Sequence, residues 1–409
     1  MGQGGDLRPV YQGEESKMTQ HNGLTWPIRL TALTVMTLGL PMAAAAQSAE
    51  EMMSSRLGTT DVGPVFQEAF EHAAMPVSEE IRAKAIQCWN DNQCDTGTGG
   101  ELTVAYADGF GENVWRQVTK MEFIMQALTY PEVGKIVYTS ARGDAAKALS
   151  DFRAYIAQGV DVIVTFADHG EALAPSIREA TESGITVILH NGTVAGTPGE
   201  DYVTNISENI CELGKEFIRA VRTGNPEAKA IAALGGTPGN PLSATWQGCA
   251  AEEVATLDGV EIIATEDTNW TQEGTFSAVS AILSRFDKID GYIYDYADGF
   301  RGGVRAYESA NKPLDFTVAL RTDEQGLFCD MKAAGNPNFK VFYSSGQNYQ
   351  ARLALTAGMM AHGGAEIPAN LDVPFSMKQA TVDQCDPSLP DEVSVSTLVD
   401  PDTLRAMFK

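Results

Sequence analysis

Positive charge is scarce in this sequence. Its 409 residues include 29 Lys and Arg against 54 Asp and Glu, which gives a formal net charge of −25. Residues 1–46 carry equal numbers of acidic and basic side chains, so the imbalance lies entirely in the rest of the chain. A surface of this charge repels nucleic acid and anionic membranes, and it favours solubility rather than any particular chemistry.

The chain also lacks an apolar run of the roughly 20 residues that a membrane-spanning helix needs. The apolar run at residues 30–40 is shorter. It follows Arg29 and precedes Pro41, Met42 and four small alanines at 43–46, which is the layout of a secretory signal peptide. We predict that Met18 is the true start, that cleavage follows Ala46, and that the mature protein is exported.

Cysteine is used sparingly, and no Cys-x-x-Cys motif or spaced histidine pair occurs, which disfavours a zinc site. The six cysteines are an even number, and in an exported protein this predicts disulfides. Cys88 and Cys94 flank a short polar turn and are expected to form one bridge. Sequence alone leaves the pairing of the other four open, and their order along the chain suggests Cys211–Cys249 and Cys329–Cys385.

Several motifs of catalysis and cofactor binding are missing. The chain has no Gly-x4-Gly-Lys-Ser/Thr phosphate loop and no Gly-x-Ser-x-Gly nucleophile elbow. Gly109 and Gly111 follow an apolar run, but Val114 stands where a dinucleotide-binding fingerprint needs its third glycine. Carboxylates are plentiful, yet sequence does not show the paired spacing that glycosidases use. We expect no cofactor and no enzymatic activity; an exported carbohydrate hydrolase is the less favoured alternative.

From residue 101 onward, short apolar runs alternate with segments of helical spacing. Unbroken Val and Ile runs between helices are typical of parallel strands buried on both faces, arranged in βαβ units. A chain of this length suits two domains. Residues 47–100 read as an extension with a helix at 78–89. The predicted strands are residues 102–106, 135–138, 160–165, 186–189, 202–205, 230–234, 261–265, 291–294, 316–320 and 341–344.

The tetrapeptide Ala-Asp-Gly-Phe occurs twice, at residues 107–110 and 297–300, each time between a strand-like run and a segment of helical spacing. Open α/β sheets place their ligands where strands end in such turns. The repetition predicts two similar sheets facing each other across a cleft, with Asp108 and Asp298 on opposite sides. The alternatives are a chance match, or two aspartates that cap the following helices.

Taken together, these stretches resemble the sugar-binding receptors of bacterial ABC importers, the ribose-type (type I) periplasmic binding proteins. The resemblance covers about residues 101–409 and rests on the order of elements and on residues 108–116, 165–177, 189–208 and 295–306. It implies two doubly wound parallel-sheet α/β domains joined by a three-crossover hinge. The implied domains are residues 101–204 plus 345–380, and 205–344 plus 381–409. The implied partners of this periplasmic monomer are a sugar or polyol ligand and an inner-membrane permease with its ATPase.

The resemblance also places candidate ligand contacts at the strand ends of both domains. Sugar hydroxyls need paired donors and acceptors, and the C–H faces of a sugar ring need aromatic walls. In the first domain the candidates are Asp108, Asn113, Trp115, Arg116, Phe166, Asp168, His190 and Asn191. The pair Trp115-Arg116 resembles receptors for furanoses. His190 and Asn191 stand where the family usually has an Asp-Arg pair, which departs from the familiar pentose and hexose contacts.

In the second domain the candidates are Thr245, Trp246, Trp270, Tyr296, Asp298 and Asp323, with Gln347 at a crossover. Thr245 stands where the family commonly carries an arginine, so Trp246 or Gln247 is expected to take over part of that role. The two tryptophans Trp115 and Trp270 have an alternative interpretation as core residues, because Trp is usually well buried.

The sequence thus predicts a receptor that captures a sugar or polyol between two closing domains and makes or breaks no bond. A receptor that serves a chemoreceptor or a sensor kinase would share the same fold and cleft, so sensing stays open as an alternative to transport.

Overall fold

The computed structural model describes residues 47–111, 113–192, 194–345 and 347–408. The predicted signal peptide and its cleavage position lie outside these residues. In the part of the chain that is described, no helix combines the length and the apolar character needed to span a bilayer.

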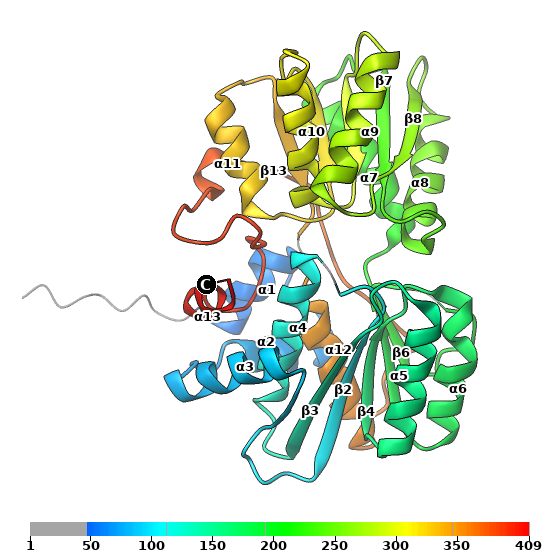
Figure 1. The fold of residues 1–409 in the computed structure, drawn as a ribbon, viewed down its shortest axis with the longest axis vertical. Helices are drawn as coiled ribbons and strands as arrows, with labels where there is room; N and C mark the ends of the chain where they lie inside the picture. Colours follow the sequence, from blue (N-terminus) through cyan, green and yellow to red (C-terminus); the bar gives the residue numbers. More distant parts are fainter. Residues whose placement is uncertain (1–46, 112, 193, 346, 409) are drawn as a thin grey trace, which may run out of the picture. The chain divides into compact units, whose positions relative to one another are not determined.

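Seven strands form a first sheet in the order β1-β3-β2-β4-β5-β6-β12 (Figure 1). Neighbouring strands are parallel, apart from the antiparallel pair β1 and β3. The edge strands β1 and β12 were not expected, because each has three residues and shows no apolar pattern. The strand bounds are β1 Gln93–Asp95, β2 Leu102–Asp108, β3 Val133–Ser140, β4 Val162–Phe166, β5 Thr186–His190, β6 Thr204–Ser207 and β12 Asn370–Asp372.

Helices cover both faces of this sheet, and sheet and helices together are called the first lobe. One face packs against α4 (Val114–Ala127) and α12 (Gln350–His362), and the other against α5 (Ala145–Gln158) and α6 (Ala174–Glu182) (Figure 1). Val104 contributes to the first of these cores and its neighbour Ala105 to the second. Burial on both faces explains why the strands read as unbroken apolar runs.

Six further strands form a second sheet in the order β13-β11-β10-β9-β7-β8. All neighbours are parallel except β11 and β13. The strand bounds are β7 Ala230–Gly235, β8 Glu261–Asp267, β9 Gly291–Tyr294, β10 Thr317–Leu320, β11 Lys340–Tyr343 and β13 Lys378–Gln379.

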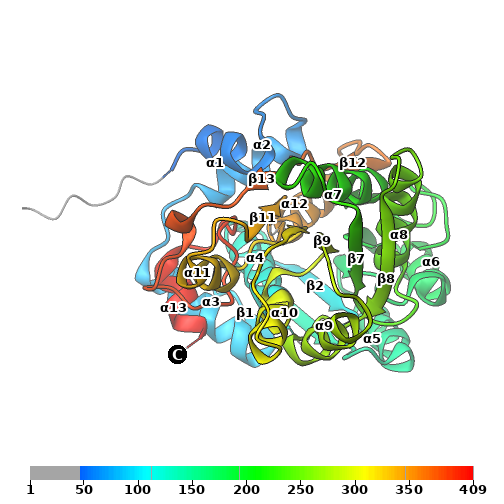
Figure 2. The same ribbon diagram turned by 90° about the horizontal axis from the view of Figure 1, so that it is seen from above.

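The second lobe consists of this sheet and the helices on its two faces. Helices α7 (Ile210–Gly224) and α8 (Pro241–Val254) lie together on one face (Figure 2). The opposite face carries α9 (Gln272–Arg285), α10 (Ala297–Ser309) and α11 (Gln325–Ala334). The predicted fold class, two parallel-sheet α/β domains, is therefore confirmed.

The chain passes between the two sheets after β6, after β11 and between β12 and β13. The prediction gave residues 381–409 to the second domain, but the structure divides them. The segment up to Val395 runs along the second lobe, whereas α13 (Pro401–Met407) packs against α3 (Glu79–Asp91) beside the first lobe. The chain therefore makes a fourth passage near its end. This segment has no strand-like or helical spacing from which the passage was foreseeable.

The extension at residues 47–100, which includes β1, is part of the first lobe. It contains α1 (Ala49–Leu57), α2 (Pro64–Ala73) and α3, whose start is capped by Ser78 Oγ accepting from the amide of Ile81 at 3.2 Å. Apolar side chains of α1 and α2, such as Leu57 and Phe70, are buried in the core that the α4 and α12 face of the sheet shares. Burial of these side chains stabilises the extension in its packed position against the first lobe.

Three disulfides join neighbouring elements, and the suggested pairing is confirmed. One bridge closes the turn between α3 and β1, one joins α7 to α8, and one joins α11 to the residue that follows the short helix η2 (Val382–Gln384). The pairs are Cys88–Cys94, Cys211–Cys249 and Cys329–Cys385.

Candidate functional site

A pocket lies where the carboxyl ends of strands from both sheets meet. The end of β4 and the loops and helix starts that follow β2, β7, β8, β9 and β10 contribute to its wall. It contains about 340 Å³ of space not filled by protein atoms, part of it open to solvent. Open α/β sheets bind ligands at this edge. The lining residues are Asn113, Trp115, Arg116, Phe166, Leu242, Trp270, Asp295, Tyr296, Arg321 and Thr322.

The start of α4 positions two of these side chains. Asn113 is the N-cap, and its Oδ1 accepts from the amide of Arg116 at 3.0 Å. This capping fixes the first helical turn, which carries Trp115 and Arg116 into the wall of the pocket. Asn348, in the second crossover, donates to the carbonyl of Trp115 at 2.9 Å and so ties the crossover to the same turn.

Arg116 is the best-connected cation of the pocket. Its Nη1 donates to Asp108 Oδ1 at 3.0 Å and its Nη2 to Asp168 Oδ1 at 2.7 Å. Its guanidinium carbon lies 3.5 Å from the centre of the Phe166 ring, within the range of a cation–π contact. Burial lowers the pKa of Arg116, but Asp168 and then Asp108 outweigh burial and leave this pKa raised. The guanidinium is therefore charged and held in one orientation.

The two carboxylates that hold Arg116 differ in their surroundings. Asp108 also accepts from Tyr138 Oη at 3.1 Å and from the amide of Phe110 at 3.0 Å. Burial raises the pKa of Asp168 to about 6, although Arg116 opposes this shift. Both side chains support Arg116, and neither lines the pocket itself.

On the side of the second lobe, Asp295 fixes two indoles. It directly follows β9, and its carboxylate accepts from Trp246 Nε1 at 3.2 Å and from Trp270 Nε1 at 2.9 Å. Burial raises the pKa of Asp295, while Trp270, Arg321 and Trp246 oppose the shift. A Cβ on Gly236 would lie 2.1 Å from the Trp270 indole, so the glycine lets the ring reach its place.

Arg321 connects the lobes across the pocket. It directly follows β10 and donates to Asn191 at the end of β5 and to Glu208 in the first crossover. Glu208 also accepts from Gln350 at 2.7 Å. Burial alone would raise the pKa of Glu208, but Arg321 and then Gln350 lower it below its ordinary value. The Glu208 carboxylate is therefore ionised, and its ion pair with Arg321 links both sides of the site.

The structure brings six of the predicted residues together in the pocket: Asn113, Trp115, Arg116, Phe166, Trp270 and Tyr296. Three others line a neighbouring pocket that shares Phe166 and Leu242 with the first: Asp168, Asn191 and Thr245.

Several predicted residues lie elsewhere. His190 is fully buried beside Tyr106, 3.1 Å from its hydroxyl, and burial, Arg116 and Arg321 lower its pKa to about 3. Its neutral ring supports the end of β5 from inside the lobe. Trp246 is a core residue that bonds Asp295. Gln347 is buried at the second crossover, where Gln350 donates to it.

The two Ala-Asp-Gly-Phe segments are not structurally equivalent, contrary to prediction. Asp108 is the last residue of β2, but β9 ends at Tyr294, so residues 297–300 form the first turn of α10. Asp298 there accepts from Gln272 Nε2 at 2.9 Å and lines neither pocket described above. The residue at the corresponding strand end is Asp295. Helix capping does not explain the pair either, because the N-caps are Asn113 and Tyr296.

Asp323 is also displaced from the site. Its Oδ1 accepts from Ser396 Oγ at 3.1 Å, beneath the segment that leads to α13. Burial raises the pKa of Asp323 to about 6, and Ser396 opposes this shift. The pocket instead takes Arg321 and Thr322 from the same loop.

Sequence reasoning missed four lining residues: Leu242, Asp295, Arg321 and Thr322. Asp295 and Arg321 directly follow predicted strands and Thr322 is the next residue, so treating the first residues after each strand as ligand positions would have found all three. Leu242 carries no polar signal, and nothing in the sequence distinguished it.

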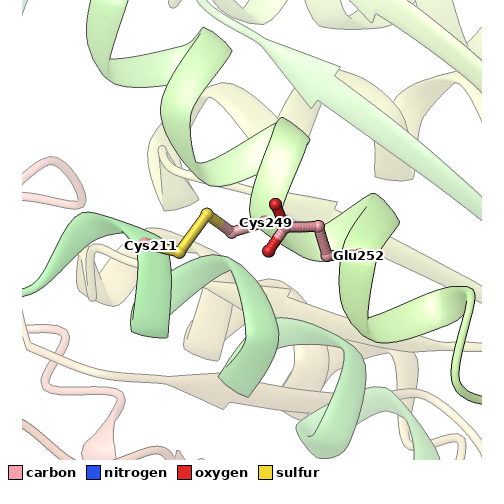
Figure 3. Close-up of side chains that lie close together, drawn as sticks. All are labelled: Cys211, Cys249 and Glu252. Atoms are coloured by element: carbon pink, nitrogen blue, oxygen red, sulfur yellow. A yellow bond between two sulfur atoms is a disulfide. The ribbon is translucent and has the colours of Figure 1, made fainter.

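One group of potential metal ligands lies on α7 and α8. Figure 3 shows Cys211 and Cys249 joined in a disulfide, with the carboxylate of Glu252 beside it. A metal ligand from cysteine is a thiolate, and both sulfur atoms are used in the bridge. Glu252 is also paired with Lys215 at 3.6 Å. This group joins two helices and offers no thiolate.

Comparison with known proteins gives a consistent set of relatives. A protein family described as "Periplasmic binding protein domain" matches residues 107–354. A xylitol-binding protein from Mycolicibacterium smegmatis is 23% identical over 202 residues, which are 49% of this chain and 57% of that protein. The alignment thus spans little more than half the length of this relative.

Solved structures share the fold. A solute-binding protein of an ABC transporter from Bacillus halodurans, with bound myo-inositol, has a TM-score of 0.61 at 15% identity, and the match covers 69% of this chain and 96% of that one. A protein from Mycobacterium smegmatis in complex with β-D-fucofuranose has a TM-score of 0.59 at 21% identity, covering 75% and 98%.

Proposed function

Because the chain belongs to the periplasmic binding protein domain family, we propose that it is a receptor that captures an uncharged sugar or polyol between its lobes for an ABC importer. It acts in the periplasm as a monomer and delivers its ligand to an inner-membrane permease with its ATPase. The observation that carries this proposal is the pocket, where aromatic rings and hydrogen-bonding groups from both lobes converge.

The pocket has the chemistry that a polyhydroxylated ligand requires. Trp115, Phe166, Trp270 and Tyr296 supply aromatic surface for C–H groups. Arg116, Asp295, Arg321 and Thr322 supply donors and acceptors for hydroxyls. Sites of this kind combine a mostly apolar lining with a few fixed polar groups, which set the orientation of the ligand.

The charge balance disfavours an anionic ligand. Arg116 is already paired with two carboxylates, Asp108 and Asp168, and Arg321 with Glu208. An anionic sugar acid or sugar phosphate would need a cation that is free to pair with it, since a buried charge without a partner is costly. The relatives named for xylitol and solved with myo-inositol and β-D-fucofuranose support the same class of ligand.

Binding requires no chemistry on the ligand. A ligand that contacts Arg116 in one lobe and Asp295 in the other favours the arrangement in which the lobes are together. Arg321 already bonds across the site in this arrangement. The permease then recognises the closed form and opens it, so that closure serves as the signal that ligand is loaded.

A thermal-shift panel tests the proposal. We expect pentitols, inositols or aldoses to stabilise the protein without its signal peptide, by about 2.7 kcal/mol when the ligand is at 100 times its dissociation constant. Sugar acids and amino acids, included as controls, should cause smaller shifts. Stabilisation by an amino acid but by no carbohydrate would refute the proposal.

Two aspartates of the second lobe provide a matched pair of variants. Asp295→Asn places an amide N–H₂ against an indole N–H, so we expect Trp270 to lose its orientation and affinity to fall by about 1–3 kcal/mol. Asp298→Asn, three residues away and outside the pocket, should bind like the native protein. Calorimetric titration of both variants with the best ligand of the panel makes the comparison, and equal losses would argue against the assigned pocket.

A further inference from the structure

The segment that leads to α13 is held by the second lobe. The amides of Gln325 and Gly326 in the first turn of α11 donate to the carbonyls of Val393 at 2.9 Å and Asp391 at 2.7 Å. These are helix N-terminal amides that would otherwise lack a partner. The amide of Val395 donates to the carbonyl of Asp323 at 3.1 Å, and Ser396 Oγ to its carboxylate.

The next residues are held by the first lobe. Thr397 Oγ1 and the amide of Leu398 donate to the same carboxylate oxygen of Glu122 on α4, at 2.6 and 2.7 Å. Glu122 is fully buried and paired with Arg352 on α12. Residues 395–398 are therefore fixed between a buried carboxylate of each lobe, Asp323 and Glu122.

Helix α1, in the extension, is hydrogen-bonded to this segment and to the second lobe. Arg56 Nε donates to the carbonyl of Ser396 at 2.8 Å, and Lys378 Nζ on β13 donates to the carbonyl of Ser55 at 2.8 Å. Helix α1, whose Leu57 is buried in the core of the first lobe, is thus tied both to the segment and to the second sheet. Figure 1 shows the segment in red between α11 and α13.

The anchor points lie on two of the elements that form the pocket: the loop after β10 and helix α4. Asp323 is two residues after Arg321, in the same loop. Glu122 is on α4, the helix whose first turn carries Trp115 and Arg116. Movement of the lobes away from each other would pull on both anchors, independently of the three other passages of the chain.

We propose that residues 391–400 and α1 form a clasp that joins the pocket walls directly, restricts lobe opening and prepares the pocket for its ligand. The effect on affinity rests on the proposed function, whereas the restriction of opening does not. A receptor that populates its binding-competent form more fully binds with higher apparent affinity, because apparent Kd equals intrinsic Kd divided by that population.

The double variant Ser396→Ala/Thr397→Val removes the side-chain bonds to Asp323 and Glu122 and keeps the chain length. Without ligand, solution scattering should give a larger radius of gyration than for the native protein, and the affinity for the ligand should fall about tenfold. At saturating ligand the native radius should return, because the variant loses the preorganisation of its pocket and not the closed form itself. Ser388→Ala, which lies just before the clasp and loses an exposed hydrogen bond from Arg405, is the matched control and should behave as native.

Arg56→Met gives a second test that leaves the segment itself unchanged. It should increase the radius of gyration of the ligand-free protein, as the double variant does. If both variants are folded and their ligand-free radii equal the native value, the clasp does not restrict opening and the proposal is wrong. This scattering result needs no ligand, so it decides the clasp even if the panel of sugars and polyols identifies none.

Discussion

Replacing Arg116 by methionine should abolish ligand binding and lower the free energy of unfolding by about 3–5 kcal/mol, because it leaves two buried carboxylates without their partner. Asp108 and Asp168 both bond this guanidinium, and Arg116 is 3% exposed. The pocket would also lose the cation that lies over the Phe166 ring. Calorimetric titration and denaturant unfolding measure the two effects.

The matched control is Arg178→Met. Arg178 also pairs with an aspartate, Asp201, at 2.6 Å, but its side chain is half exposed, so its removal should leave unfolding and binding unchanged within error. Arg116→Lys keeps the charge but cannot donate to two carboxylates at once as the guanidinium does. It should fold, and it should bind the ligand weakly. Native affinity in Arg116→Lys, or native stability in Arg116→Met, would contradict the role assigned to this residue.

Arg321 and Glu208 should behave as a coupled pair. Arg321→Met leaves Glu208 buried without its cation, and Glu208→Gln removes the charge that Arg321 needs, so each single variant should lose about 2–5 kcal/mol of ligand binding. The double variant should lose less than the sum of the single losses, with a coupling free energy of about 0.5–3 kcal/mol. Ligand titrations of all four proteins complete the cycle.

Strict additivity in this cycle would show that the two residues act independently and that the bond across the site is not part of binding. Asn191 also accepts a hydrogen bond from Arg321, so the cycle needs the variant Asn191→Ala as well. That variant removes an uncharged acceptor and should cost about 1 kcal/mol, less than the loss of Glu208.

The fold was predictable because burial of the strands on both faces leaves a simple pattern. Runs such as Val162–Phe166 are apolar throughout, and the helices between them show their own spacing. The short strands β1, β12 and β13 were not predictable in this way, since a strand of two or three residues shows no periodicity. The fourth passage of the chain was not predictable either, because it depends on hydrogen bonds that a segment without regular structure donates to Asp323 and Glu122.

The site was predictable where the ligand-facing residues follow the strand end at the expected distance along the chain. Trp115 and Arg116 lie in the turn that follows a predicted strand end, and the Asn113 N-cap found in the structure fixes that turn. In the second lobe the repeated tetrapeptide pointed to Asp298, but the strand ends three residues before the repeat begins, and Asp295 takes the position. Thr245 and Trp246 illustrate a different difficulty: which face of α8 meets the pocket depends on packing against Phe217 and Asp295, not on spacing alone.

Tryptophan fluorescence during titration with the best sugar or polyol of the panel tests whether the ligand is captured between the lobes, because Trp115 and Trp270 both line the pocket. We expect a saturable change in the native protein with one ligand bound per chain. We expect a much smaller change in the double variant Trp115→Phe/Trp270→Phe, in which Trp89 and the buried Trp246, which bonds Asp295 from outside the pocket, remain. An equal change in the double variant at the same ligand concentrations would place the ligand elsewhere and contradict capture between the lobes.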